Sequence, residues 1–193
     1  SPDSPYAESV EAKGVKEENI RMTLSDSSGK TLLSYAAVAK DPNKPLPEIV
    51  KPPLPPREIK NTEECYLVGL RNLQFHNPFV NPVDYFEEVL RRDPGDTRAN
   101  TQMGIILRQR GDLEGAEKHL RTAIKRLVKD YTRPMDCEAI YNLGLVLRAK
   151  GKMEGAEEMF YRALWNYPFN SAANTQLAQM YSMKGDFDSA LER

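Results

Sequence analysis

The stretch that decides the fold occurs twice. Residues 104–124 read GIILRQRGDLEGAEKHLRTAI, and residues 144–164 read GLVLRAKGKMEGAEEMFYRAL. The two share a leading Gly, Leu-Arg, a second Gly, Glu-Gly-Ala-Glu and a late Ala. A third copy, AQMYSMKGDFDSALER, begins at residue 178. The tetrapeptide ANTQ, at 99–102 and again at 173–176, recurs in the same alignment, so the sequence predicts one unit repeated along the chain.

Helix packing explains why side chains of the same size recur at the same positions of the repeat. Small residues at two slots let the two helices of a pair approach closely, and large apolar residues fill the gap to the next pair. Each pair then buries its apolar face by stacking on its neighbours. The small residues are Gly104, Gly144 and Ala178 in the first slot and Ala116, Ala156 and Ala190 in the second, and the large ones are Leu120 and Phe160.

A unit with this pattern and a step of 34 residues resembles the tetratricopeptide repeat, a helix–turn–helix. The family's early Trp is replaced by Asn100, Ile140 and Asn174. The resemblance implies an all-α fold, a right-handed α-solenoid of antiparallel helix pairs.

Residues that start and end helices mark the units. Potential N-caps precede each first helix, and glycines suited to a left-handed C-cap follow it. A backward step of one repeat places Leu70 in the small slot and Asn77 at the turn, with Pro82 where Ala is usual. The predicted units are 62–95, 96–135, 136–169, ended by Pro168, and a truncated 170–193. The N-caps are Thr62, Asp96, Asp136 and Asn170, and the glycines are Gly111, Gly151 and Gly185.

Two features of the repeats predict local departures. The second unit is six residues longer than a standard repeat, which predicts an extended helix after Leu120 and a loop around 132–135. Such a loop is either a tolerated insertion or a partner contact. Trp165, Tyr167 and Phe169 are expected to pack between helix pairs.

The chain changes character before residue 62. Alternating apolar residues from Ile20, a turn at SDSSG and a β-prone run over 30–38 predict a β-hairpin within 1–40. The Pro-rich stretch 41–56 cannot be helical, and the linker 41–61 that contains it is expected to be an extended spacer, or alternatively a docking motif for a Pro-reading domain. Because two strands are marginal alone, the hairpin is expected to belong to an upstream β-rich domain or to lie against the helical part.

The C-terminal unit stops early in its second helix. Leu177, Tyr181 and Phe187 are therefore expected to lack a covering neighbour, which predicts self-association through this end. The chain is accordingly interpreted as a fragment of a longer protein.

A closer resemblance covers about residues 60–193. The segments YFEEVLRRDPGDTRANTQMGIILRQRGDLEGAEKHLRTAI, YNLGLVLRAKG and ALWNYPFNSAANTQLAQMY are similar to large bacterial proteins with a β-rich domain of unknown function followed by tetratricopeptide repeats. That resemblance implies an association with carbohydrate metabolism, with any sugar-processing site upstream. It transfers no catalytic residue to this chain.

Composition excludes several classes of protein. The net charge of −1 gives no electrostatic footprint for nucleic acid. The sequence lacks an apolar run long enough to span a membrane, so neither nucleic acid nor membrane is an expected partner. The two cysteines, Cys65 and Cys137, form neither a metal-ligand spacing nor a disulfide framework. The expected location is cytoplasmic, with a periplasmic one as the alternative.

Catalytic chemistry is not expected. Sequential acidic pairs point around a helix rather than toward each other, and the two histidines, His76 and His119, are far apart in sequence. His119 is expected on the surface. The sequence has no phosphate loop, nucleophile elbow or zinc spacing, so it predicts no enzyme activity, no cofactor and no metal.

Binding is expected on the face that the first helices line. Arginines among apolar and hydroxyl side chains there can grip a carboxylate. The partner is then a protein or peptide, acidic or from the adjoining domain of the same chain. The predicted groove residues are Arg71, Gln74, Arg98, Thr101, Ile105, Arg108, Tyr141, Leu145, Arg148, Thr175 and Gln179, with Leu67, Glu138 and Ser182 at further slots.

The alternative for Arg108 and Arg148 is that they are solvated residues complementing helix dipoles. Binding of a chaperone's C-terminal tail is disfavoured. Chaperone-binding tetratricopeptide domains hold the terminal carboxylate with a set of Lys and Asn residues, and Thr101 and Ile105 occupy two of those positions here. The sequence thus predicts a non-catalytic interaction or interdomain scaffold. The rival interpretation is an accessory region of a carbohydrate-active enzyme, and a third is a structural spacer that binds no ligand.

Overall fold

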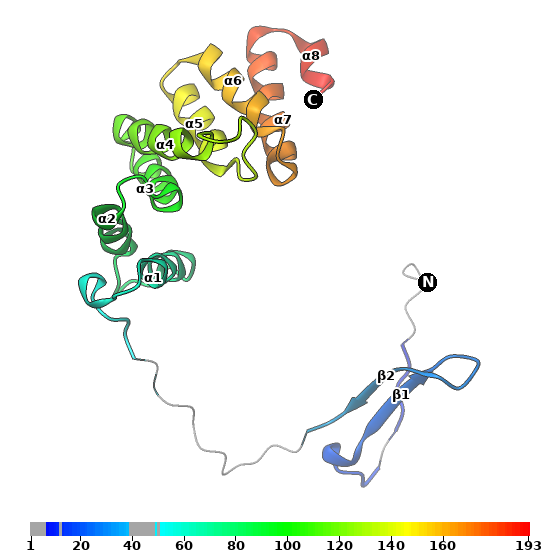
Figure 1. Cartoon of the computed structure of the whole chain (residues 1–193). Helices are drawn as coiled ribbons and strands as arrows, with labels where there is room; N and C mark the ends of the chain where they lie inside the picture. Colours follow the sequence, from blue (N-terminus) through cyan, green and yellow to red (C-terminus); the bar gives the residue numbers. More distant parts are fainter. Residues whose placement is uncertain (1–6, 12, 39–48, 50) are drawn as a thin grey trace. The chain divides into compact units, whose positions relative to one another are not determined.

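The computed structural model describes residues 7–11, 13–38, 49 and 51–193 (Figure 1). These residues fall into two compact units, Ser1–Lys51 and Pro52–Arg193. Part of the predicted extended spacer, 41–48 and residue 50, lies outside the described residues.

The N-terminal unit contains the predicted β-hairpin. After a short 3-10 helix η1 (Glu17–Asn19), strand β1 (Arg21–Ser25) pairs antiparallel with β2 (Thr31–Ala36). The Asp26 carboxylate accepts hydrogen bonds from the backbone N–H of Ser28 at 2.9 Å and of Lys30 at 3.0 Å, which closes the turn. The hairpin prediction is confirmed.

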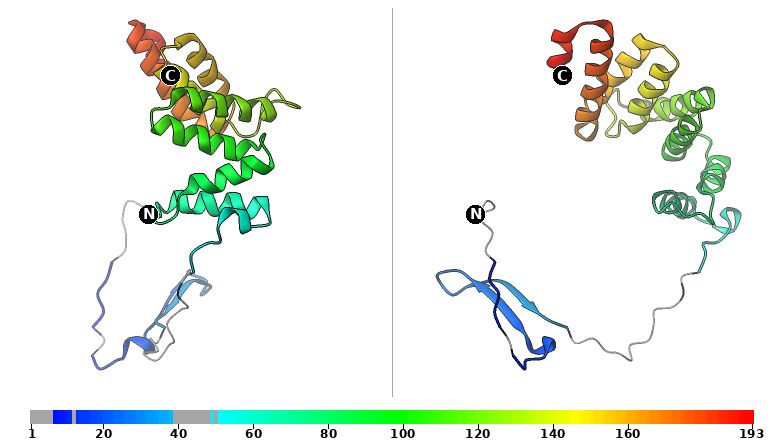
Figure 2. Two further views of the ribbon diagram at one scale, coloured as in Figure 1. Left: turned by 90° about the vertical axis from the view of Figure 1, so that its left-hand side faces the viewer. Right: turned by 180° about the vertical axis from the view of Figure 1, so that it is seen from behind.

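The second unit consists of helix pairs that follow one another in chain order (Figures 1 and 2). The contacts within each pair and between consecutive pairs are those of a tetratricopeptide-like α-solenoid, which confirms the predicted fold class. A 3-10 helix η2 (Pro56–Glu58) precedes the pairs. The helices are α1 (Thr62–Gln74), α2 (Pro82–Arg92), α3 (Thr97–Gln109), α4 (Leu113–Leu127), α5 (Glu138–Ala149), α6 (Met153–Ala163), α7 (Tyr167–Lys184) and α8 (Phe187–Leu191).

The end of the predicted spacer packs on this unit. Ile59 is only 3% exposed and belongs to the core of the first pair. The Tyr85 hydroxyl donates to the Leu54 carbonyl at 3.0 Å, and the Arg92 guanidinium donates to the Ile59 carbonyl at 2.7 Å. Residues 52–61 therefore belong with the helices rather than with a free linker.

One of the four predicted N-caps, Asp96, is correct, whereas the N-cap of α5 is Cys137, one residue after the predicted Asp136. The Asp96 carboxylate accepts from the N–H of Ala99 at 2.8 Å, and the Asp136 carboxylate accepts from the N–H of Glu138 at 2.8 Å. For α1 the capping side chain is Asn61, one residue before the predicted Thr62.

The fourth prediction, Asn170, is wrong because Asn170 lies inside α7. That helix begins at Tyr167 and has Pro168 in its first turn. Proline is well placed there, since its fixed φ suits the helix and the missing N–H has no intrahelical partner at that position. Pro168 thus opens α7, which has 18 residues.

The small slots bring the paired helices into close contact. A Cβ added at Gly104 would lie 2.5 Å from Leu120 Cγ, and one at Gly144 would lie 2.6 Å from the Phe160 ring. In the first pair the equivalent residue is Gly69, whose Cβ would lie 3.0 Å from the Phe86 ring. The predicted Leu70 is therefore wrong by one residue.

Ala178 stands apart from the other residues of its slot. It is half-buried and lines an open hollow, because α8 ends at Leu191, before a large residue can reach it.

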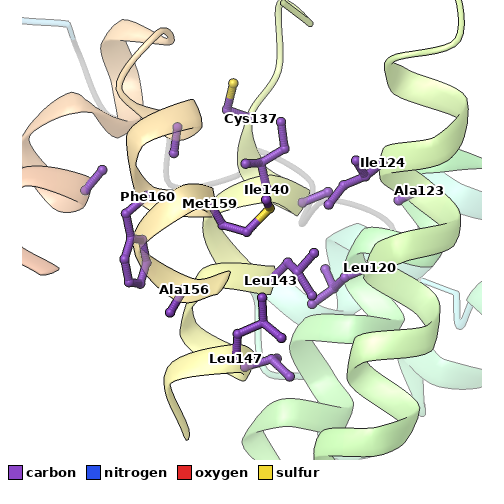
Figure 3. Packing of buried hydrophobic residues seen from close by; sticks show 14 of the residues in the cluster. Leu120, Ala123, Ile124, Cys137, Ile140, Leu143, Leu147, Ala156, Met159 and Phe160 are labelled. Atoms are coloured by element: carbon purple, nitrogen blue, oxygen red, sulfur yellow. The ribbon is translucent and has the colours of Figure 1, made fainter. Parts of the chain in front are cut away.

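The core is divided into two clusters, one over the first pair and α3, the other over α4 to α7. Figure 3 shows Leu120 from α4, Leu143 from α5 and Phe160 from α6 in the second cluster. Phe160 and Leu120 are fully buried. Each of these large side chains thus lies against the small residue of its own helix pair, within a cluster that extends over consecutive pairs.

The aromatic residues near the start of α7 behave differently from one another. Phe169 packs against Tyr141 with ring centroids 5.6 Å apart, as predicted. Trp165 is 49% exposed and Tyr167 is 93% exposed, so the prediction that they pack between pairs is wrong. They lie where α6 ends and α7 begins, and the Arg133 guanidinium sits 4.8 Å from the Trp165 ring centroid.

The C-terminal pair is better covered than expected. Leu177 is fully buried, and the Tyr181 hydroxyl lies 2.7 Å from that of Tyr161 and donates to Glu157 at 2.8 Å. Of the three residues predicted to lack cover, only Phe187 is largely exposed, at 64%. The cause is that α6 already shields the side of α7 that carries Leu177 and Tyr181.

The long second unit has the predicted extended helix. Helix α4 has 15 residues, whereas α2 and α6 have 11 each. The connection that follows, 128–137, includes the predicted loop and ends at the buried Cys137.

The turns within the pairs give a first testable prediction. Gly111 and Gly151 have φ of 85° and 73°, and His76 adopts φ of 48° at the end of α1. Because a Cβ is strained there, Gly111→Ala is expected to destabilise the fold by about 1 kcal/mol and His76→Gly to stabilise it by about 0.5–1 kcal/mol. Urea unfolding monitored by circular dichroism measures both changes. Equal midpoints for all three proteins would contradict this account.

An ion cluster between α4 and the α5–α6 turn gives a second prediction. Glu117 accepts from Lys150 Nζ at 2.6 Å and from Arg121 Nε at 2.9 Å. Lys150 above all holds the pKa of Glu117 at about 2, below its ordinary value of 4.5. This stabilisation is therefore complete above pH 4.5 and is lost as the pH falls toward 2, which amounts to about 1–2 kcal/mol.

The measurement is denaturant unfolding of wild type and Glu117→Gln between pH 6 and pH 2. Wild type is expected to lose more stability on acidification than the variant does. Glu158→Gln serves as the control, since its side chain is 67% exposed and lies 4.0 Å from Arg162. Parallel pH curves for wild type and Glu117→Gln would refute the role assigned to the cluster.

Candidate functional site: the inner groove

The first helices of the pairs form one layer. Helix α3 contacts α5, and α5 contacts α7. We call the exposed surface of α1, α3, α5 and α7 the inner groove. Its C-terminal part contains a hollow of about 740 Å³, lined by Arg148, Asn170, Ser171, Asn174, Thr175, Ala178, Gln179, Ser182, Met183 and Arg193.

The α7 wall of this hollow is neutral and polar. No charged residue occurs in α7 before Lys184, its last residue. Asn174 donates to the Asn170 side chain at 3.2 Å, and the Thr175 hydroxyl donates to the Ser171 carbonyl at 2.9 Å. Amide groups that keep spare donors and acceptors can hydrogen-bond a peptide backbone.

Arg148 bridges two first helices. Its Nη1 donates to the side-chain oxygen of Gln179 at 2.8 Å and also to that of Gln176. Arg148, Thr175 and Gln179, all predicted groove residues, therefore line one hollow. The two glutamine oxygens are neutral acceptors, so the positive charge of Arg148 has no anionic partner among the described residues.

Arg108 occupies the same slot in the preceding unit but lacks those acceptors. At the slots of Gln176 and Gln179 the preceding helix α5 has Asn142 and Leu145. The Asn142 amide donates to the Glu138 carbonyl, and Leu145 has no polar group. Accordingly the Nε of half-buried Arg108 is buried without an acceptor among the described residues. A buried donor without an acceptor costs about 1–3 kcal/mol.

The predicted residues of α1 and the start of α3 are exposed. Arg98 forms an ion pair with Glu63, with Nη1 2.9 Å from Oε1, and its guanidinium lies 4.4 Å from the Tyr66 ring centroid. Arg71 lies 6.0 Å from the Phe75 ring centroid. Gln74, at the end of α1, is exposed, as is Leu67.

Four predicted residues are less accessible. Thr101 is only 4% exposed, and its hydroxyl donates to the Thr97 carbonyl at 2.7 Å, so it presents little to a ligand. Ile105, Tyr141 and Leu145 are half-buried, and the last two pack against the core cluster.

The N-terminal end of α5 adds a carboxylate to the groove. The Gln102 amide, on α3, donates to Glu138 Oε2 at 3.4 Å. Burial, with a smaller contribution from Asp136, raises the pKa of Glu138 above its ordinary value. Glu138 also raises the pKa of Tyr66, although burial is the main cause of that shift.

The sequence contained a signal for two groove residues that were not predicted. Gln102 and Gln176 are the last residues of the two ANTQ tetrapeptides. Gln102 connects α3 to Glu138 of α5, and Gln176 connects α7 to Arg148 of α5. The repeated glutamine thus links one first helix to another in both places.

His119 and the two cysteines are partly or fully withdrawn from solvent. His119, predicted on the surface, is half-buried with Nδ1 2.8 Å from the Asn100 side-chain oxygen, and burial lowers its pKa. Because Asn100 stands where the family has Trp, a polar contact replaces aromatic packing there. Burial raises the pKa of Cys65 and Cys137, and both thiols are free.

Within the described residues, no group of three or more His, Cys, Asp and Glu side chains is arranged to hold a metal ion. Within the same residues, no helix combines the length and the hydropathy needed to cross a bilayer.

Comparison with known proteins agrees with this geometry. Residues 96–168 match a family model described as tetratricopeptide repeat. Among solved structures, a crystal structure of MamA has a TM-score of 0.57 and 20% identity, over 68% of this chain and 73% of that one. MamA 41-end from Desulfovibrio magneticus RS-1 has a TM-score of 0.57 and 23% identity, over 70% and 72%. At these identities the likeness concerns the fold.

Proposed function

We propose, from the premise that this chain is a tetratricopeptide repeat protein, that its helical unit is a non-catalytic scaffold. It binds a protein segment in the inner groove through an acidic group. The observation that carries this proposal is Arg108, whose buried Nε has no acceptor among the described residues, whereas its repeat equivalent, Arg148, donates from Nη1 to two glutamine oxygens. A carboxylate of a bound segment would accept a charge-assisted hydrogen bond from the Arg108 guanidinium and would also balance its charge.

The alternative role for these arginines, complementing helix dipoles, requires only that they be solvated. The Nε of Arg108 does not meet that requirement, since this nitrogen is buried. Dipole complementation explains why basic residues stand at the ends of α3 and α5. It does not explain a donor withdrawn from water without a partner.

The test is a fluorescence anisotropy titration with a labelled octapeptide that carries two Asp residues and a free C-terminal carboxylate. Arg108→Ala and Arg148→Ala are each expected to weaken binding about 10-fold, the effect of one charge-assisted hydrogen bond. The matched control is Lys125→Ala, an exposed cation on α4 outside the groove. Equal affinity of wild type and both arginine variants would eliminate the groove as the acidic-ligand site.

Other parts of the interpretation rest on the sequence alone. That the chain is part of a larger bacterial protein and that it is cytoplasmic remain predictions. No contact among the described residues favours the carbohydrate-enzyme alternative. Self-association also remains a prediction, and its apolar candidates are Met183, Phe187 and Leu191, which are 66%, 64% and 86% exposed.

A further inference from the structure

Glu138 differs from the other glutamates that touch a neighbouring helix. Glu63, Glu117 and Glu157 each pair with an Arg or Lys of another element. Glu138 is half-buried, and its side chain meets the Gln102 amide at 3.4 Å. No basic side chain of the described residues pairs with it or lowers its pKa.

A carboxylate in this position is costly to the fold. Taking it partly out of water without a cation disfavours its charged form, which agrees with the raised pKa of Glu138. The N-terminal end of α5 favours the charged form and offsets part of that cost. The charge is therefore available at the groove surface and is not neutralised within the described part of the chain.

Carboxylates outnumber cations among the charged groups that act on Tyr66, one of which is Glu138. The carboxylates of Glu138, Asp96 and Glu63 each raise the pKa of Tyr66, and a single cation, Arg98, lowers it. Arg98 pairs with Glu63 and donates two hydrogen bonds to its carboxylate. Asp136 adds a fourth carboxylate beside Glu138. A partner group that enters here is favoured if it is positively charged.

We propose that Glu138, with Gln102 beside it, is a subsite for a basic side chain, Lys or Arg, of the segment bound in the inner groove. This inference rests on the proposed function, since it gives that segment a second charge. Glu138 lies seven residues along α5 from Leu145, which occupies the position that Gln179, the partner of Arg148, has in the next unit. That separation is about 10 Å at 1.5 Å per residue. An extended segment covers that distance in about three residues.

The experiment uses the full chain labelled with ¹⁵N and three capped heptapeptides of Ser and Ala. One has a central Lys, one a central Gln and one a central Glu. Amide shifts of α5 are followed during each titration. For wild type, the Lys peptide is expected to shift residues at the start of α5, and the Gln peptide is not.

Glu138→Gln is expected to weaken binding of the Lys peptide about 10-fold. The matched control, Glu154→Gln, changes an exposed glutamate at the start of α6 and is expected to keep wild-type affinity. Thermal unfolding separates binding from folding: Glu138→Gln is expected to unfold at the same or a higher temperature than wild type, because the variant mimics the neutral form that burial favours.

Unchanged affinity of Glu138→Gln for the Lys peptide would overturn the inference, as would a lower unfolding temperature, which would show that the charge serves the fold. The Glu peptide keeps the two proposals separate. If the Glu peptide binds through Arg108 while the affinity for the Lys peptide does not depend on Glu138, the proposed function is supported and the Glu138 subsite is refuted.

Discussion

Phe160→Ala is expected to lower the free energy of unfolding by about 3–5 kcal/mol, the largest effect of any single change considered for this chain. The Phe160 ring is fully buried between α5 and α6, within the cluster that α4 to α7 share (Figure 3). Removing it leaves a cavity that the surrounding helices cannot close, because Gly144 lies against the ring and has no side chain to move into the space.

Denaturant unfolding at equilibrium, followed by far-ultraviolet circular dichroism, measures this loss. Tyr167→Ala is the control, since that ring is 93% exposed and its loss is expected to change stability by less than about 0.5 kcal/mol. If Phe160→Ala were no more destabilised than Tyr167→Ala, the stacking account of the core would be untenable.

Gly144→Ala is expected to destabilise the protein by about 1–3 kcal/mol, although alanine is the better helix former. The added Cβ would lie 2.6 Å from the Phe160 ring, closer than two carbons can approach. The ring is rigid and enclosed, so α5 and α6 would have to separate. This predicted loss follows from tertiary contact and opposes the local helix preference.

Gly155→Ala is the matched control, because its Cβ would meet only Leu147 at 3.4 Å, an ordinary contact. It is expected to stabilise the protein by about 0.5–1 kcal/mol through helix propensity alone. In the double variant Gly144→Ala/Phe160→Ala the alanine at 144 is expected to cost nothing further, since the ring it would strike is absent. A penalty that persists in the double variant would show that the ring is not its cause.

The candidate site was only partly predictable from sequence. The repeat alignment identified Arg108, Arg148 and Gln179 as groove residues, and the structure places Arg148 and Gln179 in contact. The alignment also identified Thr101 as a groove residue, but its hydroxyl donates to the Thr97 carbonyl of its own helix. The position of a residue within the repeat predicts which face of the helix it lies on, but not which groups surround its side chain. The sequence therefore could not predict that the Nε of Arg108 has no acceptor among the described residues.

Local sequence determined the helix pairs themselves. The spacing of Gly104 and Leu120, repeated by Gly144 and Phe160, specifies which residues of a pair are in contact. Gly111 and Gly151, with positive φ, specify where the first helix of each pair ends. These features act over a few turns of chain, where propensity, capping and the apolar period all favour the same conformation.

Tertiary structure decided what depends on neighbours far apart in sequence. Packing of the first pair placed Gly69 rather than Leu70 against α2, and contact with α6 buried Leu177. Among the described residues, the packing of α3 on α5 left Glu138 without a basic partner and the Nε of Arg108 without an acceptor. The physical reason is that burial and ion pairing depend on distances between helices, which no single repeat encodes and which arise only when consecutive pairs stack.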